Sequence, residues 1–176
     1  LIYLTSLGLE WKNAYQKTLE FVKKTAVPLA FNPGTPQFNC GVDSIKNILS
    51  VTDILFVNKE EGEILASSKE KEIKNLMLKI RQLGPKIVVI TDGKNGSYAM
   101  NDKNEFFSQP IVPTAIVEKT GAGDAYASGF LAATLSNLPL QTAMKWGTLN
   151  ASGTMSAIGA QNGLLSKAEM EEKMNG

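Results

Sequence analysis

The feature that most constrains the fold of this chain is the uninterrupted apolar run Ile87-Val88-Val89-Ile90, within residues 86–91. An apolar strand without polar alternation is typical of a parallel sheet that is covered on both faces. Strand-like runs also occur at 1–5, 27–31 and 53–57, separated by stretches with helical periodicity at 11–24, 45–49, 60–66 and 69–83. This alternation predicts an α/β fold class, with a largely parallel sheet and helices on both of its faces.

The pattern changes after residue 91. Three closely spaced strands are expected at 97–100, 105–108 and 114–117, which predicts a small antiparallel meander. Helices are expected at 124–135 and 140–157, with a short helical tail from Lys167, and the turn-rich segment 32–36 closes the strand at 27–31. Because repeats, low-complexity tracts and obvious linkers are lacking, residues 1–176 are predicted to form a single α/β domain.

Composition excludes several classes of function. The net charge of +1 gives no electrostatic support for nucleic acid or an anionic membrane as a partner. The absence of histidine removes Ser-His-Asp catalysis and most zinc sites. The lone Cys40, read as a small filler near a turn, cannot form an internal disulfide, which favours a cytoplasmic location. No apolar run approaches the roughly 20 residues of a membrane span.

One segment combines backbone freedom with a carboxylate: Thr120-Gly121-Ala122-Gly123-Asp124-Ala125, between an expected strand and an expected helix. Glycines let a backbone approach a ligand closely, and the first amides of a helix point outwards without intrahelical partners. Such a helix start is suited to an anion such as a phosphate. A carboxylate beside that anion makes sense if it takes a proton from an attacking hydroxyl, whereas the alternative is a tight turn with Asp124 capping the helix.

Three motifs in order resemble the ribokinase-like (PfkB) family of carbohydrate and nucleoside kinases. The segment from Thr120 to Ala125, followed by Ser128-Gly129-Phe130, is similar to the family's C-terminal signature. Upstream, residues 53–61 look like its strand ending in Asn-x-x-Glu, and residues 88–96 resemble its nucleotide-side strand and Thr-x-Gly turn. Neither the Walker spacing nor the dinucleotide G-x-G-x-x-G spacing occurs, so other phosphate motifs do not compete.

The resemblance implies a role for each matching residue. Asp124 is expected to act as the catalytic base, and the amides of Gly121, Ala122 and Gly123 to form the anion hole for the transferring phosphoryl group. Asn58 and Glu61 are expected, from the resemblance, to hold Mg²⁺ with the ATP phosphates through water. The alternatives are a helix cap for Asn58 and a solvated charge for Glu61.

The nucleotide side is implied in the same way. Thr91, Gly93 and Gly96 are expected to line the phosphates or ribose of ATP. Asn150 and the loop at 158–161 fall where the family packs around adenine, and an exposed helix residue is the alternative for Asn150.

Two departures from the family pattern qualify this picture. Glu118-Lys119 stands where the family commonly has Asp-Thr beside a monovalent cation. The Lys119 ammonium is one hypothetical replacement for that cation, and a solvent-exposed Lys119 is the alternative. The family's N-terminal portion, which recognises the acceptor, is expected to be absent, because the chain opens on Leu1 as though inside a strand. The remaining piece is then expected to expose an apolar edge and to associate, as a homodimer or with the missing part.

The sequence therefore predicts an ATP- and Mg²⁺-dependent kinase that acts on a hydroxyl of a small sugar. The alternatives are a nucleoside kinase, a hydroxymethylpyrimidine or pyridoxal kinase of the same fold, and a non-catalytic nucleotide-binding module.

Overall fold

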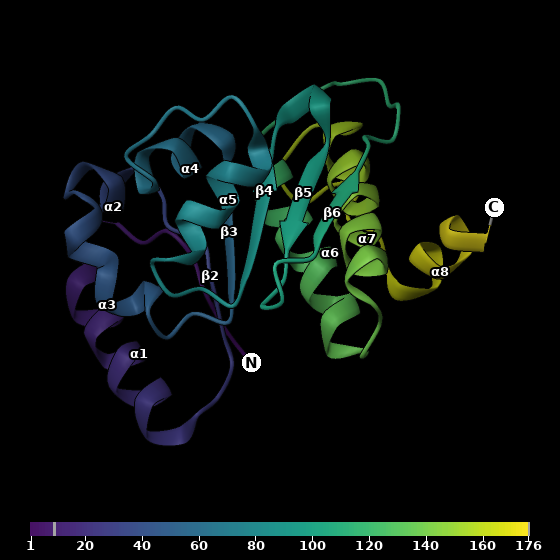
Figure 1. Ribbon diagram of the computed structural model, residues 1–176. Helices are drawn as coiled ribbons and strands as arrows, with labels where there is room; N and C mark the ends of the chain where they lie inside the picture. The colour runs from purple at the N-terminus through teal and green to yellow at the C-terminus, as the bar shows by residue number, and fades with distance from the viewer. Residues whose placement is uncertain (9, 176) are drawn as a thin grey trace. The chain divides into compact units, whose positions relative to one another are not determined.

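The computed structural model describes residues 1–8 and 10–175 (Figure 1). Its strands are β1 (Ile2–Leu4), β2 (Leu29–Phe31), β3 (Ile54–Asn58), β4 (Ile87–Thr91), β5 (Ser97–Met100) and β6 (Phe106–Gln109). Its helices are α1 (Trp11–Thr25), α2 (Thr35–Asn39), α3 (Lys46–Leu49), α4 (Lys59–Leu65), α5 (Ile73–Arg81), α6 (Ala122–Leu135), α7 (Leu140–Met155) and α8 (Lys167–Asn175), with short 3-10 turns at Val42–Ile45 and Gly93–Asn95.

The chain separates into two compact units. Unit 1 contains Leu1–Thr91 and Ala99–Phe106, and unit 2 contains Asp92–Tyr98 and Phe107–Gly176. Compactness alone does not show whether a unit folds by itself, so the expected single domain stays a prediction. Among the described residues, no helix is both long enough and apolar enough to cross a membrane.

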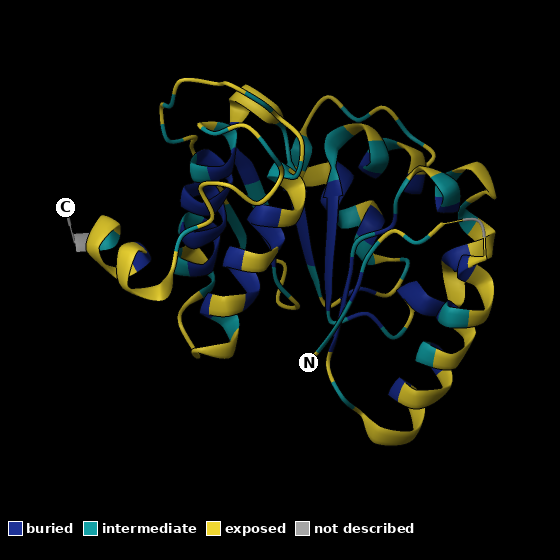
Figure 2. Ribbon diagram, turned by 180° about the vertical axis from the view of Figure 1, so that it is seen from behind, coloured by how far each residue is buried: buried dark blue, intermediate teal, exposed yellow. Residues whose placement is uncertain are grey.

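Unit 1 is built on four parallel strands. The register pairs Tyr3 with Ala30, Ala30 with Ile54, and Leu55 with Val88. The strands β2, β3 and β4 are buried almost throughout and appear dark blue in Figure 2. Burial of consecutive residues means that both faces of these strands are covered, because neighbouring side chains point to opposite sides of a sheet. The prediction of a parallel sheet is therefore confirmed.

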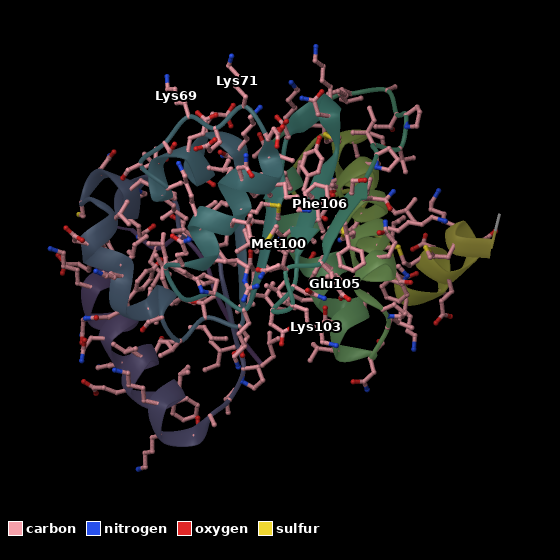
Figure 3. The ribbon with its side chains drawn as sticks, in the orientation of Figure 1. Lys69, Lys71, Met100, Lys103, Glu105 and Phe106 are labelled. Carbon is pink, nitrogen blue, oxygen red and sulfur yellow. The ribbon has the colours of Figure 1, made fainter. Side chains whose placement is uncertain are left out.

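The sheet becomes mixed after β4. All six strands are hydrogen-bonded neighbours in the order β1-β2-β3-β4-β5-β6. The links from β4 to β5 and from β5 to β6 span five residues each, at 92–96 and 101–105. Such short links permit only antiparallel neighbours, since a parallel crossover takes a dozen or more residues. Figure 3 labels Lys103 and Glu105 at the second of these turns, and Lys69 and Lys71 projecting from the segment between α4 and α5.

The third meander strand, expected at 114–117, does not form. Residues 110–117 adopt no regular structure. Their backbone instead follows the end of α7, because the amides of Val117 and Glu118 both donate to the Met155 carbonyl, at 2.9 and 3.3 Å. The last carbonyls of a helix lack intrahelical donors, so this contact satisfies a group that a strand at 114–117 would have left exposed.

The turn expected at 32–36 is shorter than predicted, because a helix begins inside it. Helix α2 starts at Thr35, with Pro36 in its first turn, where the missing proline N–H costs nothing. Gln37 in this helix is fully buried, and its amide joins the Gly34 N–H, the Ser6 hydroxyl and the Leu7 carbonyl. Cys40 is exposed at the end of α2, so it does not fill the core.

Unit 2 is organised around the helix pair α6 and α7, which pack closely. Gly129 lies against the Trp146 carbonyl oxygen, which would be 2.8 Å from an added Cβ. Gly147 lies against the Tyr126 carbonyl oxygen, which would be 2.9 Å from an added Cβ. The two glycines thus bring the two backbones together from opposite sides. Within the same unit, the buried Tyr126 hydroxyl donates to Ser97 Oγ at 2.9 Å.

Candidate active site

The predicted site residues are divided between the two units. In unit 1, Asn58 ends β3 and Thr91 ends β4, and the two residues are paired in the parallel register. Ligands of open α/β sheets bind at the carboxyl ends of the strands. The structure therefore brings Asn58 and Thr91 together at the sheet edge where a ligand is expected, and Glu61 follows in the first turn of α4.

Asn58 and Glu61 form a reciprocal capping box at the start of α4. Asn58 Oδ1 accepts from the Glu61 N–H at 2.8 Å, and Glu61 Oε2 accepts from the Asn58 N–H at 2.9 Å. The helix-cap alternative for Asn58 is thus present in the structure. This role is compatible with ligand binding, because the cap fixes the Glu61 carboxylate beside Thr91's strand and engages only one of its oxygens.

Glu61 is half-buried, so it is not the solvated charge that the alternative reading expected. Burial raises the pKa of its carboxyl above the usual value, and the Asn58 amide opposes that rise. A desolvated carboxylate at neutral pH gains from a nearby cation. A single carboxylate with a polar neighbour suits hydrated Mg²⁺, which keeps most of its own waters.

In unit 2, the segment from Lys119 to Gly123 turns the chain into α6. Gly121 has φ +80°, and an added Cβ would lie 2.7 Å from the Ala160 carbonyl oxygen. Only glycine combines that conformation with that closeness at low cost. The segment is therefore shaped by Gly121, whereas Gly123 faces open space with no atom within 4 Å of an added Cβ.

The expected anion hole is only partly available as predicted. The Ala122 N–H donates to the Lys119 carbonyl at 3.2 Å, and the Ala125 N–H donates to the Gly121 carbonyl at 2.8 Å. Within the described residues, the amides of Gly121, Gly123 and Asp124 have no acceptor. Gly123 and Asp124 are also exposed in the first turn of α6, so their amides are the ones best placed for an anion.

Asp124 lies in the first turn of α6, as predicted, although the helix begins two residues earlier than expected, at Ala122, and the Asp124 side chain does not cap it. It is exposed, and no hydrogen bond or ion pair to it is recorded within the described part of the chain. A carboxylate that the protein does not use structurally, next to two unsatisfied amides, is available for chemistry. The alternative of a helix-capping Asp124 is wrong.

The remaining predicted nucleotide residues lie in unit 2 and differ in character. Gly93 is exposed, with φ +49° in a 3-10 turn. Gly96 is buried, and an added Cβ would stand 2.2 Å from the Gln109 carbonyl, which gives this glycine a packing role. That Gly93 and Gly96 line the phosphates or ribose of ATP stays a prediction.

Asn150 is buried rather than exposed, so the exposed-helix alternative is wrong. Its Nδ2 donates to the Ala125 carbonyl at 2.8 Å and to Ser128 Oγ at 3.2 Å, and its Oδ1 accepts from the Leu165 N–H at 2.9 Å. These bonds join α7 to α6 and to the segment before α8. Asn150 therefore positions α6, and its amide is occupied by the protein.

Sequence reasoning missed the connection made by Glu118. Its Oε2 accepts from the Gly159 N–H at 2.8 Å. The two residues stand 41 positions apart, so no local signal announced the contact. Lys119, the next residue, is exposed, as the alternative interpretation expected. The hypothesis that its ammonium replaces a monovalent cation stays untested.

An open α/β sheet with polar residues at its carboxyl edge, and a glycine turn leading into a helix, are features that recur in proteins that bind phosphorylated ligands. The family model for pfkB family carbohydrate kinases matches residues 3–167, and the chain belongs to this family. The mixed sheet and its helices are the ribokinase-like fold.

Relatives with curated names are kinases of small molecules. A nucleoside kinase of Methanothermobacter thermautotrophicus is 30% identical over 145 residues, covering 82% of this chain and 45% of the relative. A cytidine kinase of Thermococcus kodakarensis is 32% identical, covering 74% of this chain and 47% of the relative. The chain thus spans about half the length of these relatives.

The fold is shared with solved structures. An E. coli protein described as a ribokinase II, in complex with ATP and Mg²⁺, superimposes with a TM-score of 0.85 at 20% identity. The match covers 98% of this chain and 57% of that protein.

Proposed function

We propose that this chain is the nucleotide-binding and catalytic part of an ATP-dependent kinase that phosphorylates a hydroxyl of a small sugar or sugar-like acceptor. The observation that carries the proposal is the first turn of α6, where the exposed Asp124 carboxylate stands beside the unsatisfied amides of Gly123 and Asp124. Membership of the family supports it.

In this mechanism the Asp124 carboxylate accepts the proton of the acceptor hydroxyl, whose oxygen attacks the γ-phosphorus of ATP while the bond to the β–γ bridging oxygen breaks and ADP leaves. General-base help of this kind contributes roughly 10²–10⁴ in rate. The free amides at the start of α6 stabilise the charge that develops on the transferring phosphoryl group. The Gly121 turn holds these amides in place through its contact with Ala160.

Glu61, with Asn58, would hold hydrated Mg²⁺, and the ion when bound would neutralise phosphate charge. Glu61 fits this task because it is half-buried and leaves one carboxylate oxygen without a protein partner among the described residues. The E. coli relative solved with ATP and Mg²⁺ supports the same pair of ligands for this chain.

A nucleoside acceptor is the second candidate. The two curated relatives described above act on nucleosides by name, and one of them matches 82% of this chain. A cytoplasmic location and self-association stay predictions.

Calorimetry of ATP–Mg²⁺ with the chain tests the first half of the proposal, and turnover of a sugar and nucleoside panel by the full-length gene product tests the second. Asp124→Asn is expected to retain ATP binding and to lose turnover by a factor on the order of 10²–10⁴. Lys103→Ala, on the exposed turn between β5 and β6, serves as the control and is expected to change neither.

Unchanged turnover in Asp124→Asn would remove Asp124 from the mechanism. ATP binding without turnover of any acceptor by the full-length product would favour a non-catalytic nucleotide-binding module instead.

A further inference from the structure

Two loops of unit 2 are held together by three contacts, of which two run between the loops and one runs from the first loop to Met155, the last residue of α7. The glycine loop (residues 117–123) leads into α6, and the post-α7 loop (residues 156–163) follows α7. The Met155 carbonyl at the end of α7 accepts from the Val117 and Glu118 amides, at 2.9 and 3.3 Å. Gly121 lies against Ala160, where an added Cβ would stand 2.7 to 3.0 Å from the nearest atoms.

The third contact is the only one of these made by an ionisable side chain. Glu118 Oε2 accepts from the Gly159 N–H at 2.8 Å. The Gly159 amide, and next the Thr120 hydroxyl, hold the pKa of Glu118 below its usual value, so the carboxylate is ionised at neutral pH. A hydrogen bond to an ionised acceptor is stronger than one between neutral groups.

The three contacts hold the segment that orients the free amides of Gly123 and Asp124. Gly121 is the N-terminal cap of α6, and the unsatisfied Gly123 and Asp124 amides follow it directly. A shift of the post-α7 loop is transmitted to Gly121 by its close contact with Ala160. Glu118 is three residues before Gly121 and fixes the other side of the same junction.

The charge of Glu118 also argues against direct contact with the anion. A second carboxylate at the phosphate would repel it, and Oε2 already points to Gly159. Its contribution to anion binding therefore has to pass through the loops that it joins.

We propose that Glu118 is a positioning residue that fastens the post-α7 loop to the glycine loop through Gly159 and thereby holds the amides at the start of α6 in the geometry that binds the phosphates of ATP. This inference rests on the proposed function, because it concerns the same anion site.

Two measurements on the chain test it. The first is hydrogen exchange of the Gly159 amide by NMR without nucleotide, which reports the contact itself. The second is the Kd for ATP–Mg²⁺ by calorimetry, at a temperature where thermal unfolding shows every variant to be folded. The variants are Glu118→Ala, Glu118→Gln, which retains an acceptor oxygen, and Glu105→Ala as the control. Glu105 is likewise a loop carboxylate that accepts a hydrogen bond, here from Asn101, but it is exposed whereas Glu118 is half-buried.

Glu118→Ala is expected to lose Gly159 protection and to weaken ATP binding by about tenfold. Glu118→Gln is expected to recover part of both, and Glu105→Ala to match the wild type. Unchanged protection in Glu118→Ala would overturn the contact, and lost protection with unchanged Kd would overturn its positioning role. A wild-type chain that does not bind ATP would defeat the proposed function as well, whereas binding that ignores Glu118 defeats this inference alone.

Discussion

Gly121 and Gly123 stand two residues apart but differ in what a methyl group would meet. Gly121→Ala places a Cβ at φ +80° and 2.7 Å from the Ala160 carbonyl, so it is expected to lower the free energy of unfolding by about 1–3 kcal/mol. Gly123→Ala meets no atom within 4 Å and is expected to raise it by about 0.4–1 kcal/mol, because alanine restricts the unfolded chain.

The same pair separates folding from ligand binding. In Gly123→Ala the added methyl stands on the exposed side of the first turn of α6, where the phosphate is proposed to approach. ATP affinity is therefore expected to fall although stability rises. Urea titration gives the first quantity and calorimetry the second. A Gly123→Ala chain that binds ATP as tightly as the wild type would place the anion elsewhere.

Glu61 shows the same conflict between stability and binding, with an electrostatic cause. Burial raises the pKa of its carboxyl in the folded state, so ionisation of Glu61 at neutral pH opposes folding. That cost is absent at low pH and appears as pH rises through the raised folded-state pKa. Glu61→Gln removes the charge and keeps an oxygen for the Asn58 amide. Its free energy of unfolding at pH 7 is expected to equal or exceed that of the wild type, while Mg²⁺-dependent ATP binding is lost.

At the scale of elements, the capping box of α4 is a separate test of the same residues. Asn58→Ala removes the oxygen that accepts the Glu61 N–H, and is expected to lower the free energy of unfolding by about 0.5–2 kcal/mol. Urea titration of Asn58→Ala beside Glu61→Gln checks both signs. A loss of stability in Glu61→Gln, which keeps an oxygen for the Asn58 backbone N–H, would show that the Glu61 charge supports the helix.

Asn150 joins three elements of unit 2, so its loss is expected to be structural. Asn150→Ala leaves the Leu165 amide and the Ala125 carbonyl without their side-chain partner, and the expected cost is about 1–3 kcal/mol of unfolding free energy. Thermal unfolding measures it. If stability is retained and only ATP affinity falls, Asn150 contacts the nucleotide directly, as the family resemblance implied.

Elements that depend on local pattern were predictable from the sequence. The run Ile87–Ile90 forms a strand because continuous apolar residues have few other solutions, and Asp124 lies in the first turn of its helix because Gly121 ends the preceding segment. The strand expected at 114–117 failed for a nonlocal reason. Its β-branched residues favour a strand, but the Met155 carbonyl competes for the same backbone amides.

Roles that depend on long-range contacts were likewise not predicted from the sequence. Helix α2 was hidden by turn residues, since Pro36 ends a helix in most positions and begins one here. The buried amides of Gln37 and Asn150 each find partners at distant positions that sequence spacing does not reveal. The Glu118–Gly159 contact belongs with them.

At the scale of the whole molecule, the two tryptophans of the chain report on different units. Trp11 is buried in α1 of unit 1, and Trp146 is buried in α7 of unit 2. Trp146→Phe leaves tryptophan fluorescence from unit 1 alone, and Trp11→Phe leaves tryptophan fluorescence from unit 2 alone. Within each variant, far-UV circular dichroism follows both units together.

If residues 1–176 form one domain, fluorescence and circular dichroism should give the same urea midpoint in each variant, since a cooperative transition looks the same to every probe. ATP–Mg²⁺ at 100 times its Kd should then raise the free energy of unfolding by about 2.7 kcal/mol for both reporters. Separate midpoints, with ATP shifting only one of them, would show that the units unfold independently and that the nucleotide is held by one unit, because a ligand stabilises only the cooperative unit whose folded state it binds.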